Sequence, residues 1–302
     1  MKLEDVESAR QAYHKKIKTE WMYFWIISGI FVVAALALGG ASGGFSLFGA
    51  LFALFFFGIV YLIVSVFLNR KVAEVYRNAY KSYFVARNLA SVFTNLTYQH
   101  NLGLSKEVLR QTGMINTGDD YSSNDLTIAK YKNIDFSQAD ATIQIVSTDS
   151  DGNTTYTTIF KGRFMIFEFP KKFDFKLELI GKKFHAYRVP GKDQATSRKM
   201  SKIKTESEEF NRTFKIYGQD GFESFYLLDP AMIVKIQAIS EYYKNKILIG
   251  FYDNKMLVAL DDGKDSFEPP RASRPINEAE EMRKVASSVK VITDFVDIIS
   301  SR

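Results

Sequence analysis

An apolar block over residues 21–68 constrains the fold of this chain more than any other feature, because it contains no charged residue. The stretch LGGASGGFS, residues 38–46, interrupts the block with four glycines and two serines. Roughly 20 apolar helical residues cross a bilayer core of about 30 Å, so each half of the block is long enough for one span. Glycine and serine leave a helix readily and allow a tight reversal. The block therefore predicts a transmembrane helical hairpin that turns near residues 39–46.

Basic residues on both sides of the block predict its orientation, since the turn itself carries no charge. Lys and Arg are retained on the cytoplasmic side of membrane proteins. Both termini are therefore predicted to be cytoplasmic, with the hairpin in the inner membrane of the cell. Trp21, Tyr23 and Trp25 predict an aromatic belt at the inner interface. The flanking basic residues are Lys2, Arg10, Lys15, Lys16 and Lys18 before the block and Arg70, Lys71, Arg77, Lys81 and Arg87 after it.

Three other interpretations of the block are weaker. A cleaved signal peptide would use the small residues of ALGG, but the leading segment is long and acidic for a signal sequence. A buried soluble hairpin would need a polar helix face, which LFALFFFGIVYLIVSVFL lacks. Gly40, Ser42 and Gly44 match the nucleophile elbow G-x-S-x-G, which requires a strand before the serine. Predicted helices flank this serine, so the motif is interpreted as a turn.

The rest of the chain divides into three parts. Residues 1–20 are predicted to form a cytoplasmic amphipathic segment, residues 69–98 a juxtamembrane helix and residues 99–302 a cytosolic α+β domain. A stripe along the juxtamembrane helix recurs at steps of four and three, as on a packed helix face. This stripe either packs on its own domain or mediates self-association. Its residues are Val72, Tyr76, Ala79, Tyr83, Ala86, Ala90 and Phe93.

Antiparallel hairpins packed with helices are predicted for the α+β domain. ATIQIVST and TTYTTIFKGRFMIFEF are two strands that reverse at Asp151 and Gly152, where a calcium loop is disfavoured because the glycine comes too early. RTFKIYG and FESFYLL form a second strand pair, and KILIGFYDNKMLVAL forms a third hairpin. Asp229 and Pro230 are suited to cap and start a helix. The linker FEPPRASRP precedes a final helix over residues 276–300, whose apolar stripe covers a sheet face or joins the juxtamembrane helix.

Little in the sequence predicts catalysis. The chain has no cysteine, which excludes disulfides, thiolate metal sites and cysteine nucleophiles. Only His14, His100 and His185 occur, without metal-site spacing, and no phosphate-binding G-x-x-x-x-G-K-[ST] is present. We therefore predict no catalytic residue, no metal site and no cofactor. The remaining enzymatic alternative is a cation held by an acidic, serine-rich surface loop that contains Asp119, Asp120 and Asp125.

A basic segment over residues 182–204 is the strongest candidate binding feature. It carries eight basic residues and one acidic residue, Asp193. Each Lys or Arg near an anionic leaflet contributes about 1 kcal/mol, so docking on lipid head groups or on an acidic partner is predicted. The alternative is a solvated loop, and nucleic acid is less well supported because no binding motif accompanies Phe184 and Tyr187. The candidates are Lys182, Lys183, Arg188, Lys192, Arg198, Lys199, Lys202 and Lys204.

The segments IFKGRFMIFEF, FNRTFKIYGQDGFESFYLLDPAMIVKI and FEP, together with the acidic stretch DDYSSND, resemble the bacterial family DUF3137. The resemblance covers roughly residues 105–269. It implies a protein that is usually membrane-anchored and whose reaction, if any, is unknown. Asp229 stands where the family more often has Thr, which is a conservative change for a helix cap.

The predicted function is a non-enzymatic, membrane-anchored cytosolic module that binds anionic lipid or a partner protein, or a second copy of itself. The alternatives are an enzyme acting near the membrane through the acidic loop and a structural subunit of a membrane complex. The cytosolic location also predicts that the N-x-[ST] sites at Asn95, Asn153 and Asn211 are not glycosylated.

Overall fold

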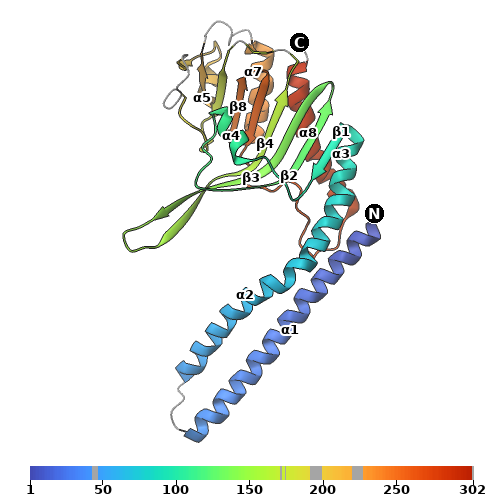
Figure 1. Cartoon of the computed structure of the whole chain (residues 1–302), viewed down its shortest axis with the longest axis vertical. Helices are drawn as coiled ribbons and strands as arrows, with labels where there is room; N and C mark the ends of the chain where they lie inside the picture. Colours follow the sequence, from blue (N-terminus) through green and yellow to red (C-terminus); the bar gives the residue numbers. More distant parts are fainter. Residues whose placement is uncertain (43–46, 171, 174, 191–198, 220–226, 301–302) are drawn as a thin grey trace. The chain divides into compact units, whose positions relative to one another are not determined.

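The computed structural model of the chain describes residues 1–42, 47–170, 172–173, 175–190, 199–219 and 227–300 (Figure 1). The chain forms two compact units. The hairpin unit contains Met1–Val85 and Glu268–Glu281, and the sheet unit contains Ala86–Phe267 and Met282–Arg302.

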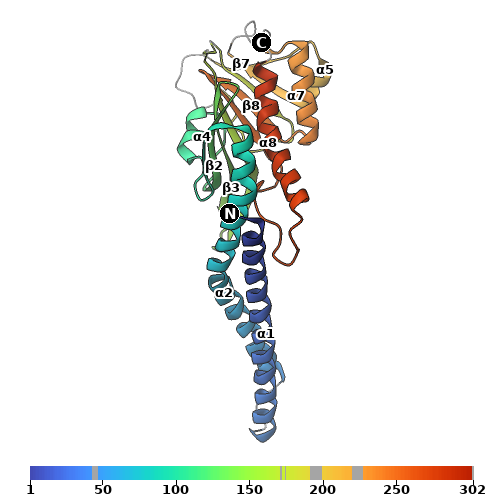
Figure 2. The same cartoon turned by 90° about the vertical axis from the view of Figure 1, so that its right-hand side faces the viewer.

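Two long helices build the hairpin unit. α1 (Leu3–Ser42) and α2 (Leu47–Tyr80) lie side by side and antiparallel in both views (Figures 1 and 2). Phe24 of α1 stacks on Phe57 of α2 with ring centroids 5.9 Å apart. The same ring lies 4.6 Å from the ring of Tyr61. Aromatic packing therefore joins the two helices along their apolar faces.

The first twenty residues do not form a segment of their own. They are the first half of α1, and the helix continues without interruption into the apolar block. The helix also extends to Ser42, so Gly40 and Ser42 are helical and no strand precedes the serine of the G-x-S-x-G pattern. Part of the turn predicted near residues 39–46 is thus helix. Its remaining part, residues 43–46, lies outside the described residues.

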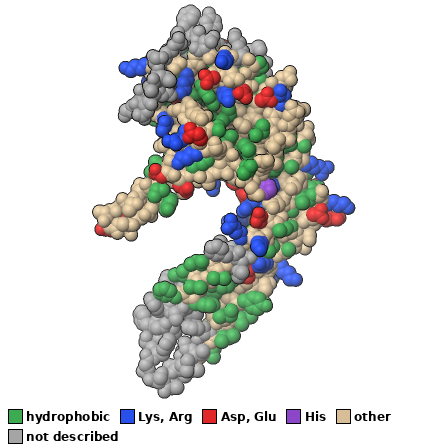
Figure 3. Space-filling model, viewed as in Figure 1, with side chains coloured by type: hydrophobic (Ala, Val, Ile, Leu, Met, Phe, Trp, Pro, Cys, Tyr) green, Lys and Arg blue, Asp and Glu red, His purple; other side chains and the backbone are tan. Residues whose placement is uncertain are grey.

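Apolar side chains are exposed along the described parts of both helices (Figure 3). Such a continuous apolar surface is typical of a site that contacts lipid or another protein. Among the described residues, the stretch Phe56–Val92 is long and apolar enough to cross a membrane. This indicates membrane association, whereas the second span and the side on which the termini lie remain predictions. The exposed residues include Trp25, Ile30, Val33, Phe56, Val60 and Ile63, with exposed fractions of 52–68%.

Within the hairpin unit, the segment Glu268–Glu281 packs against the helical residues Tyr76 and Tyr83 through their hydroxyl groups. Tyr76 donates a hydrogen bond to the carbonyl oxygen of Pro270 at 3.0 Å. Tyr83 donates to the carboxylate of Glu278 at 2.6 Å. Both tyrosines belong to the four-three stripe, so this part of the stripe packs on its own chain. Of the two alternatives for the stripe, the structure thus supports packing within the chain.

The helix predicted over residues 69–98 ends earlier than expected. A π-helical turn, η1 (Lys81–Val85), follows α2, and α3 (Ala86–Val92) ends the helical part. Residues Thr94–Gln99 form strand β1, which pairs with β2. Asn95 has a φ of 51°, which interrupts helical geometry. The β-branched threonines of this stretch suit a strand that can pair with an available sheet edge, and this long-range pairing overrides the local helix-forming composition.

A nine-stranded antiparallel sheet forms the centre of the sheet unit, in the order β1-β2-β3-β4-β9-β8-β5-β7-β6. The α+β class with antiparallel hairpins and helices is confirmed. The other strands are β2 (Asp120–Tyr131), β3 (Ile134–Thr148), β4 (Thr154–Glu168), β5 (Leu177–Gly181), β6 (Ser201–Ile203), β7 (Phe214–Gly218), β8 (Ile247–Tyr252) and β9 (Lys255–Leu260). The other helices are α4 (Lys106–Thr112), α5 (Glu208–Thr213), α7 (Pro230–Tyr242) and α8 (Glu278–Ser300).

Both faces of the central strands are covered. Phe160 and Phe164 of β4 belong to a buried apolar cluster that also contains Leu109 of α4. Phe167, on the opposite face of β4, lies 6.3 Å from the ring of Phe295 in α8. Figure 2 shows α4 on one side of the sheet and α7 and α8 on the other. The predicted stripe of α8 therefore covers a sheet face: Val285, Val289, Ile292 and Val296 are buried.

The predicted turns and caps are confirmed where the structure describes them. The Asp149 carboxylate accepts hydrogen bonds from the backbone N–H groups of Asp151 at 3.0 Å and Asn153 at 2.8 Å, so these residues form a hairpin turn. β8 and β9 join at residues 253 and 254. Asp229 accepts a hydrogen bond from the N–H of Met232 at 2.7 Å, which caps α7 at its predicted start.

The predicted strand RTFKIYG, residues 212–218, is confirmed over Phe214–Gly218, which form β7, and is wrong only for its first two residues. Arg212 and Thr213 end α5 instead of starting the strand. The side chain of Ser207 accepts a hydrogen bond from the N–H of Phe210 at 3.2 Å and so caps the start of α5. This cap stabilises a short helix that the strand-like pattern did not predict. The remaining strand, β7, pairs with β5 and β6. Most of FESFYLL, residues 222–226, lies outside the described residues.

Candidate functional site

Six of the eight predicted lipid- or partner-binding residues lie in the described part of the basic segment. Lys182 and Lys183 directly follow β5, and Lys202 lies in β6, which is an edge strand of the sheet. The six side chains are exposed, and none forms a side-chain hydrogen bond or ion pair with another described residue. Their role in docking remains a prediction. They are Lys182, Lys183, Arg188, Lys199, Lys202 and Lys204, whereas Lys192 and Arg198 lie outside the described residues.

The prediction that Asp119, Asp120 and Asp125 lie together in an acidic surface loop is wrong. Asp120 begins β2, and Asp125 lies inside the same strand with an exposed fraction of 0%. Asp119 accepts a hydrogen bond from the N–H of Val146 at 2.9 Å. The stretch forms a strand because β1 and β3 pair with its two edges. The three carboxylates therefore do not form the open cation site that the enzymatic alternative required.

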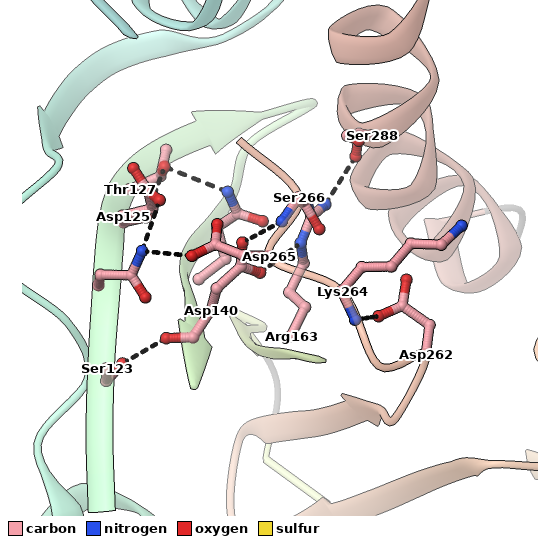
Figure 4. A network of polar contacts seen from close by, with 12 residues as sticks. Ser123, Asp125, Thr127, Asp140, Arg163, Asp262, Lys264, Asp265, Ser266 and Ser288 are labelled. Carbon is pink, nitrogen blue, oxygen red and sulfur yellow. Dashed lines mark hydrogen bonds and ion pairs between the residues drawn. The ribbon is translucent and has the colours of Figure 1, made fainter. Parts of the chain in front are cut away.

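A buried ion pair lies at the centre of the sheet (Figure 4). Asp140 of β3 and Arg163 of β4 are direct cross-strand neighbours, so their side chains share one face. Arg163 Nε lies 3.4 Å from Asp140 Oδ1, and the two side chains are 5% and 4% exposed. The second oxygen of Asp140 accepts a hydrogen bond from the N–H of Ser266 at 2.6 Å. Arg163 Nη1 donates to the carbonyl oxygen of Ser288 in α8 at 2.8 Å.

The environment of this pair shifts the acidity of the carboxyl group. Burial raises the pKa of Asp140 to about 7, although the positive charge of Arg163 lowers it. The nearby carboxylate of Asp265 raises this pKa further. Asp140 thus titrates close to neutral pH in the folded protein.

A second polar group continues the network. Tyr98 donates through its hydroxyl to Asp125 at 2.5 Å. Asn124 donates to Asp125 at 2.8 Å and to Asp265 at 2.9 Å, so one amide bridges two carboxylates. Burial raises the pKa of the Tyr98 hydroxyl, and the charge of Asp125 adds to this shift. The hydroxyl therefore remains protonated and acts as a donor.

Gly162 provides the space that this arrangement needs. A Cβ atom at this position would collide with the carbonyl oxygen of Leu260 in β9. The clash would be with backbone, which cannot move aside as a flexible side chain can. In IFKGRFMIFEF, Gly162 therefore allows β4 to approach the end of β9 closely. The next residue, Arg163, places a charged side chain on the buried face of the sheet.

A cleft of about 790 Å³ adjoins the ion pair. Its size falls within the range of small-molecule sites. Its described lining contains more basic than acidic side chains, together with several hydroxyl groups, and it contains no histidine. The basic side chains are those of Arg163, Lys244, Lys246, Lys264 and Lys284.

Two buried polar atoms on the cleft lining have no hydrogen-bond partner among the described residues. They are Nη2 of Arg163 and Oδ1 of Asp265. Buried donors and acceptors are almost always paired in folded proteins, so these atoms mark the cleft as a site where further polar contacts can form. A guanidinium donor surrounded by lysines is the chemistry of anion binding rather than of a nucleophile with a base.

Residues 158–300 match the family described as protein of unknown function, DUF3137. This match, here called the DUF3137 region, is consistent with a member of that family. The DUF3137 region runs from β4 through α8 and contains Arg163 and every described residue that lines the cleft. The match begins later than the resemblance over residues 105–269 suggested and extends to the end of α8. The stretch DDYSSND lies before the DUF3137 region.

One solved structure is similar to the chain: the crystal structure of the mycobacterial trehalose monomycolate transport factor A, TtfA. The sequences are 12% identical, the TM-score is 0.39, and the alignment covers 74% of this chain and 93% of that chain. A similarity of this size carries no argument about function. No curated protein matches the chain.

Sequence reasoning missed the network around Arg163. The segment IFKGRFMIFEF predicts a strand and carries part of the family resemblance, and neither of these indicates a buried ion pair. A signal was present, because Arg163 and Asp140 are charged residues inside otherwise apolar strands, and buried charges are seldom kept without a partner. Their pairing could not be predicted without the register between β3 and β4.

Proposed function

We propose that this chain is a membrane-anchored binding module of the bacterial cytosol. In this proposal α1 and α2 both span the inner membrane, the termini and the sheet unit are cytosolic, and the sheet unit binds an anionic surface or partner. The observation that carries the proposal is the apolar surface of α1 and α2, on which side chains such as Ile30 and Val33 are more than 60% exposed. Exposure of so much apolar surface to water would be unfavourable by about 25 cal/mol per Å².

Flanking charges support the orientation within this proposal. The side chains next to the apolar parts of α1 and α2 include Lys15, Lys18, Arg70 and Lys71, whereas the connection between the helices has no charge. Lys and Arg close to a span keep that end in the cytoplasm. Two spans satisfy this preference, because they place the basic start of α1 and the basic end of α2 on the cytoplasmic side together.

Single-cysteine labelling tests the topology directly, because the natural chain contains no cysteine. Ser8→Cys in α1 and Asp151→Cys at the β3–β4 turn are both exposed positions. We expect a membrane-impermeant maleimide to label them only after the cells are permeabilised. Gly44→Cys in the predicted external turn is the matched control and should react in intact cells. Labelling of Asp151→Cys in intact cells would refute the cytosolic location.

We further propose that the basic segment docks on anionic lipid head groups. Six exposed basic side chains without ion-pair partners among the described residues support this step. At about 1 kcal/mol for each basic residue near the membrane surface, three or four contacts would hold the tethered segment on an anionic bilayer.

Hydrogen–deuterium exchange of the full chain in nanodiscs tests this docking. Backbone amides around Lys182 and Lys202 should exchange more slowly in nanodiscs with 30% phosphatidylglycerol than in nanodiscs of phosphatidylcholine alone. At 0.1 M salt the Debye length is about 10 Å, so basic side chains in direct contact with the head groups are still attracted to them. The effect should vanish when the six described basic residues are replaced by Gln. Exchange around Lys130, outside the segment, is the internal control. Equal exchange in both lipids would exclude lipid docking.

A specific feature of the sheet favours a second candidate, a subunit of a larger membrane complex. β2 pairs with β3 only as far as Gln144, and β4 pairs with β9 only from Arg163 onward. Residues 145–157 therefore extend as a two-stranded arm whose two strands pair only with each other, as Figure 1 shows. Two-stranded hairpins without a core are marginally stable alone. The Tyr156 side chain on this arm is 60% exposed.

Native electrophoresis in mild detergent tests this candidate. Replacement of residues 147–155 by a short Asn-Gly turn should reduce the apparent size of the complex without unfolding the sheet. Tyr156→Ser is the conservative variant, and it should weaken assembly in the same direction. An unchanged size for both variants would remove the arm as an assembly element.

A further inference from the structure

Arg163 holds its guanidinium group in a defined orientation. Nε faces Asp140, and Nη1 donates to the carbonyl oxygen of Ser288. The carbon of the guanidinium lies 5.0 Å from the centre of the Phe267 ring, which packs against the group. The third nitrogen, Nη2, is buried and has no partner among the described residues, although its side chain lines the cleft. One donor of a side chain that lines the cleft is therefore left unused by the described residues.

The acidic side chains of the cleft are already engaged by the protein. Asp261 accepts a hydrogen bond from the N–H of Lys161 at 3.1 Å through one oxygen, and its other oxygen lies 3.8 Å from Nζ of Lys246. Lys246 therefore has a long ion-pair contact with Asp261 and would share its charge with a bound anion. Asp262 accepts from the N–H of Lys264 at 3.0 Å, and burial raises its pKa. Asp265 accepts from Asn124 at 2.9 Å through one oxygen. Oδ1 of Asp265 keeps no partner among the described residues. The exposed ammonium group of Lys264 likewise has no ion-pair partner among them.

The surrounding groups favour an oxyanion over a neutral ligand. Arg163, Lys246 and Lys264 come from three different parts of the chain and line the same cleft. Guanidinium and ammonium groups together bind carboxylates and phosphates through charge-assisted hydrogen bonds. A group with two negative charges gains more from several cations than a single carboxylate does. The hydroxyl group of Tyr242 adds a neutral donor to the lining, whereas the hydroxyl of Ser287 already donates to the carbonyl oxygen of Lys284 at 2.7 Å.

We propose that this cleft is a binding site for a phosphate group, with Arg163 Nη2 as the buried donor and Lys246 and Lys264 as the cations that complete it. The site is distinct from the basic segment of residues 182–204. The phosphate belongs to a soluble phosphate compound or to a lipid head group, since both present the same chemistry. The site does not depend on the membrane topology proposed above, because all of its residues belong to the sheet unit.

Calorimetric titration of the full-length protein in nonionic detergent with inorganic phosphate tests the site. Saturable binding with one site per chain is expected. Lys264→Gln, at an exposed position, should weaken the affinity about threefold to fivefold, as expected for loss of one partly screened charge contact. Lys172→Gln, at an exposed position outside the cleft and the basic segment, removes the same charge elsewhere and should leave the affinity unchanged. The absence of saturable binding, or equal weakening by both variants, would overturn the proposal.

The buried donor needs a variant that retains the fold. Arg163→Met alone leaves Asp140 buried without its cation, so Arg163→Met combined with Asp140→Asn is the appropriate pair. This double variant should fold, as judged by circular dichroism, and lose phosphate binding more than tenfold. Asp140→Asn in the presence of Arg163 is its control and should bind phosphate at least as well as the natural chain. Undiminished binding by the folded double variant would overturn the role of Arg163.

Nanodiscs separate the two sources of phosphate. The phosphate titration is repeated at 0.3 M salt, where surface charges are strongly screened, in phosphatidylcholine with and without phosphatidylglycerol. If a lipid head group fills the cleft, phosphatidylglycerol should weaken phosphate binding. If the ligand is a soluble phosphate compound, the affinity should be the same in both discs. Either result supports a phosphate site, whereas no saturable binding in either disc refutes it.

Discussion

Asp140 and Arg163 are direct neighbours on adjacent strands, 3.4 Å apart between Oδ1 and Nε, and both side chains are at least 95% buried. The pair connects β3 and β4 with the segment after β9 and with α8, through Ser266 and Ser288. An ion pair in this position costs desolvation energy but excludes other registers, because a one-residue slip would separate the charges.

The first prediction concerns this pair. Arg163→Met should lower the free energy of unfolding by about 3–5 kcal/mol, because it leaves a buried carboxylate without its cation. The double variant with Asp140→Asn should recover much of this loss. Urea unfolding of the full chain in detergent, followed by circular dichroism, measures both. The exposed pair of Lys132 and Asp297, 2.9 Å apart, is the control: Lys132→Gln should leave the urea midpoint nearly unchanged, because solvent screens this pair. A double variant as unstable as Arg163→Met would contradict this account.

The second prediction concerns pH. Burial raises the pKa of Glu178 to about 7, although Lys176 lies 3.5 Å away and lowers it. An acid whose pKa is raised by folding stabilises the protein below its unfolded pKa, and this contribution is lost as the pH rises through 7. The free energy of unfolding of Glu178→Gln, measured relative to that of the natural chain, should therefore rise by about 2–3 kcal/mol between pH 5 and pH 8.

Urea midpoints at the two pH values test the Glu178 prediction. The contribution of Asp140 is common to the natural chain and the variant, so it cancels in the comparison. Glu209→Gln, at an exposed position of α5, is the matched control and should show the same pH dependence as the natural chain. A Glu178→Gln variant with an unchanged pH dependence would show that the carboxyl group is not titrating in this range.

The third prediction concerns the space at Gly162. Gly162→Ala should destabilise the sheet by about 3 kcal/mol, since the new Cβ meets the backbone oxygen of Leu260. Gly250→Ala is a useful comparison, because its Cβ would meet the flexible side chain of Met114, which can move. The order of the two thermal midpoints, with Gly162→Ala lower, is the expected result. The reverse order would indicate that β4 can shift away from β9.

The fourth prediction concerns the start of α7. Asp229→Ala removes the acceptor for the N–H of Met232 and should cost about 1 kcal/mol. Asp229→Ser retains a capping oxygen and should cost only a few tenths of that amount. The difference between the two urea midpoints measures the cap. Equal midpoints would mean that Pro230 and the packing of α7 alone define the helix start.

Local patterns predicted the parts of the fold that depend on neighbouring residues. Asp229 followed by Pro230 predicted the start of α7, and the turn at Asp149 was predicted because a short polar stretch separates two strand-like runs. The same local reasoning failed for residues 94–99 and for Asp125. In both cases pairing with a strand distant in sequence overrides the local preference, and no local pattern contains that information.

The same contrast between local and long-range information applies to the two candidate binding sites. The basic segment could be proposed from the sequence because its residues are consecutive, and its role stays a prediction. The cleft beside Arg163 could not be proposed in this way because its residues are scattered along the chain. Asp140 and Ser266, which share a hydrogen bond, are 126 residues apart in the sequence.

The amino-acid order alone dictates an apolar helical stretch, a set of hairpins and a helix cap, because each of these arises from hydrophobicity and hydrogen bonding within a few residues. The assembly of nine strands and α8 brings Arg163, Asp140, Ser266 and Ser288 to one point and leaves a basic cleft beside them. That juxtaposition depends on strand register and on the path of the chain after β9, and these are determined by burial of both sheet faces rather than by any local stretch of residues.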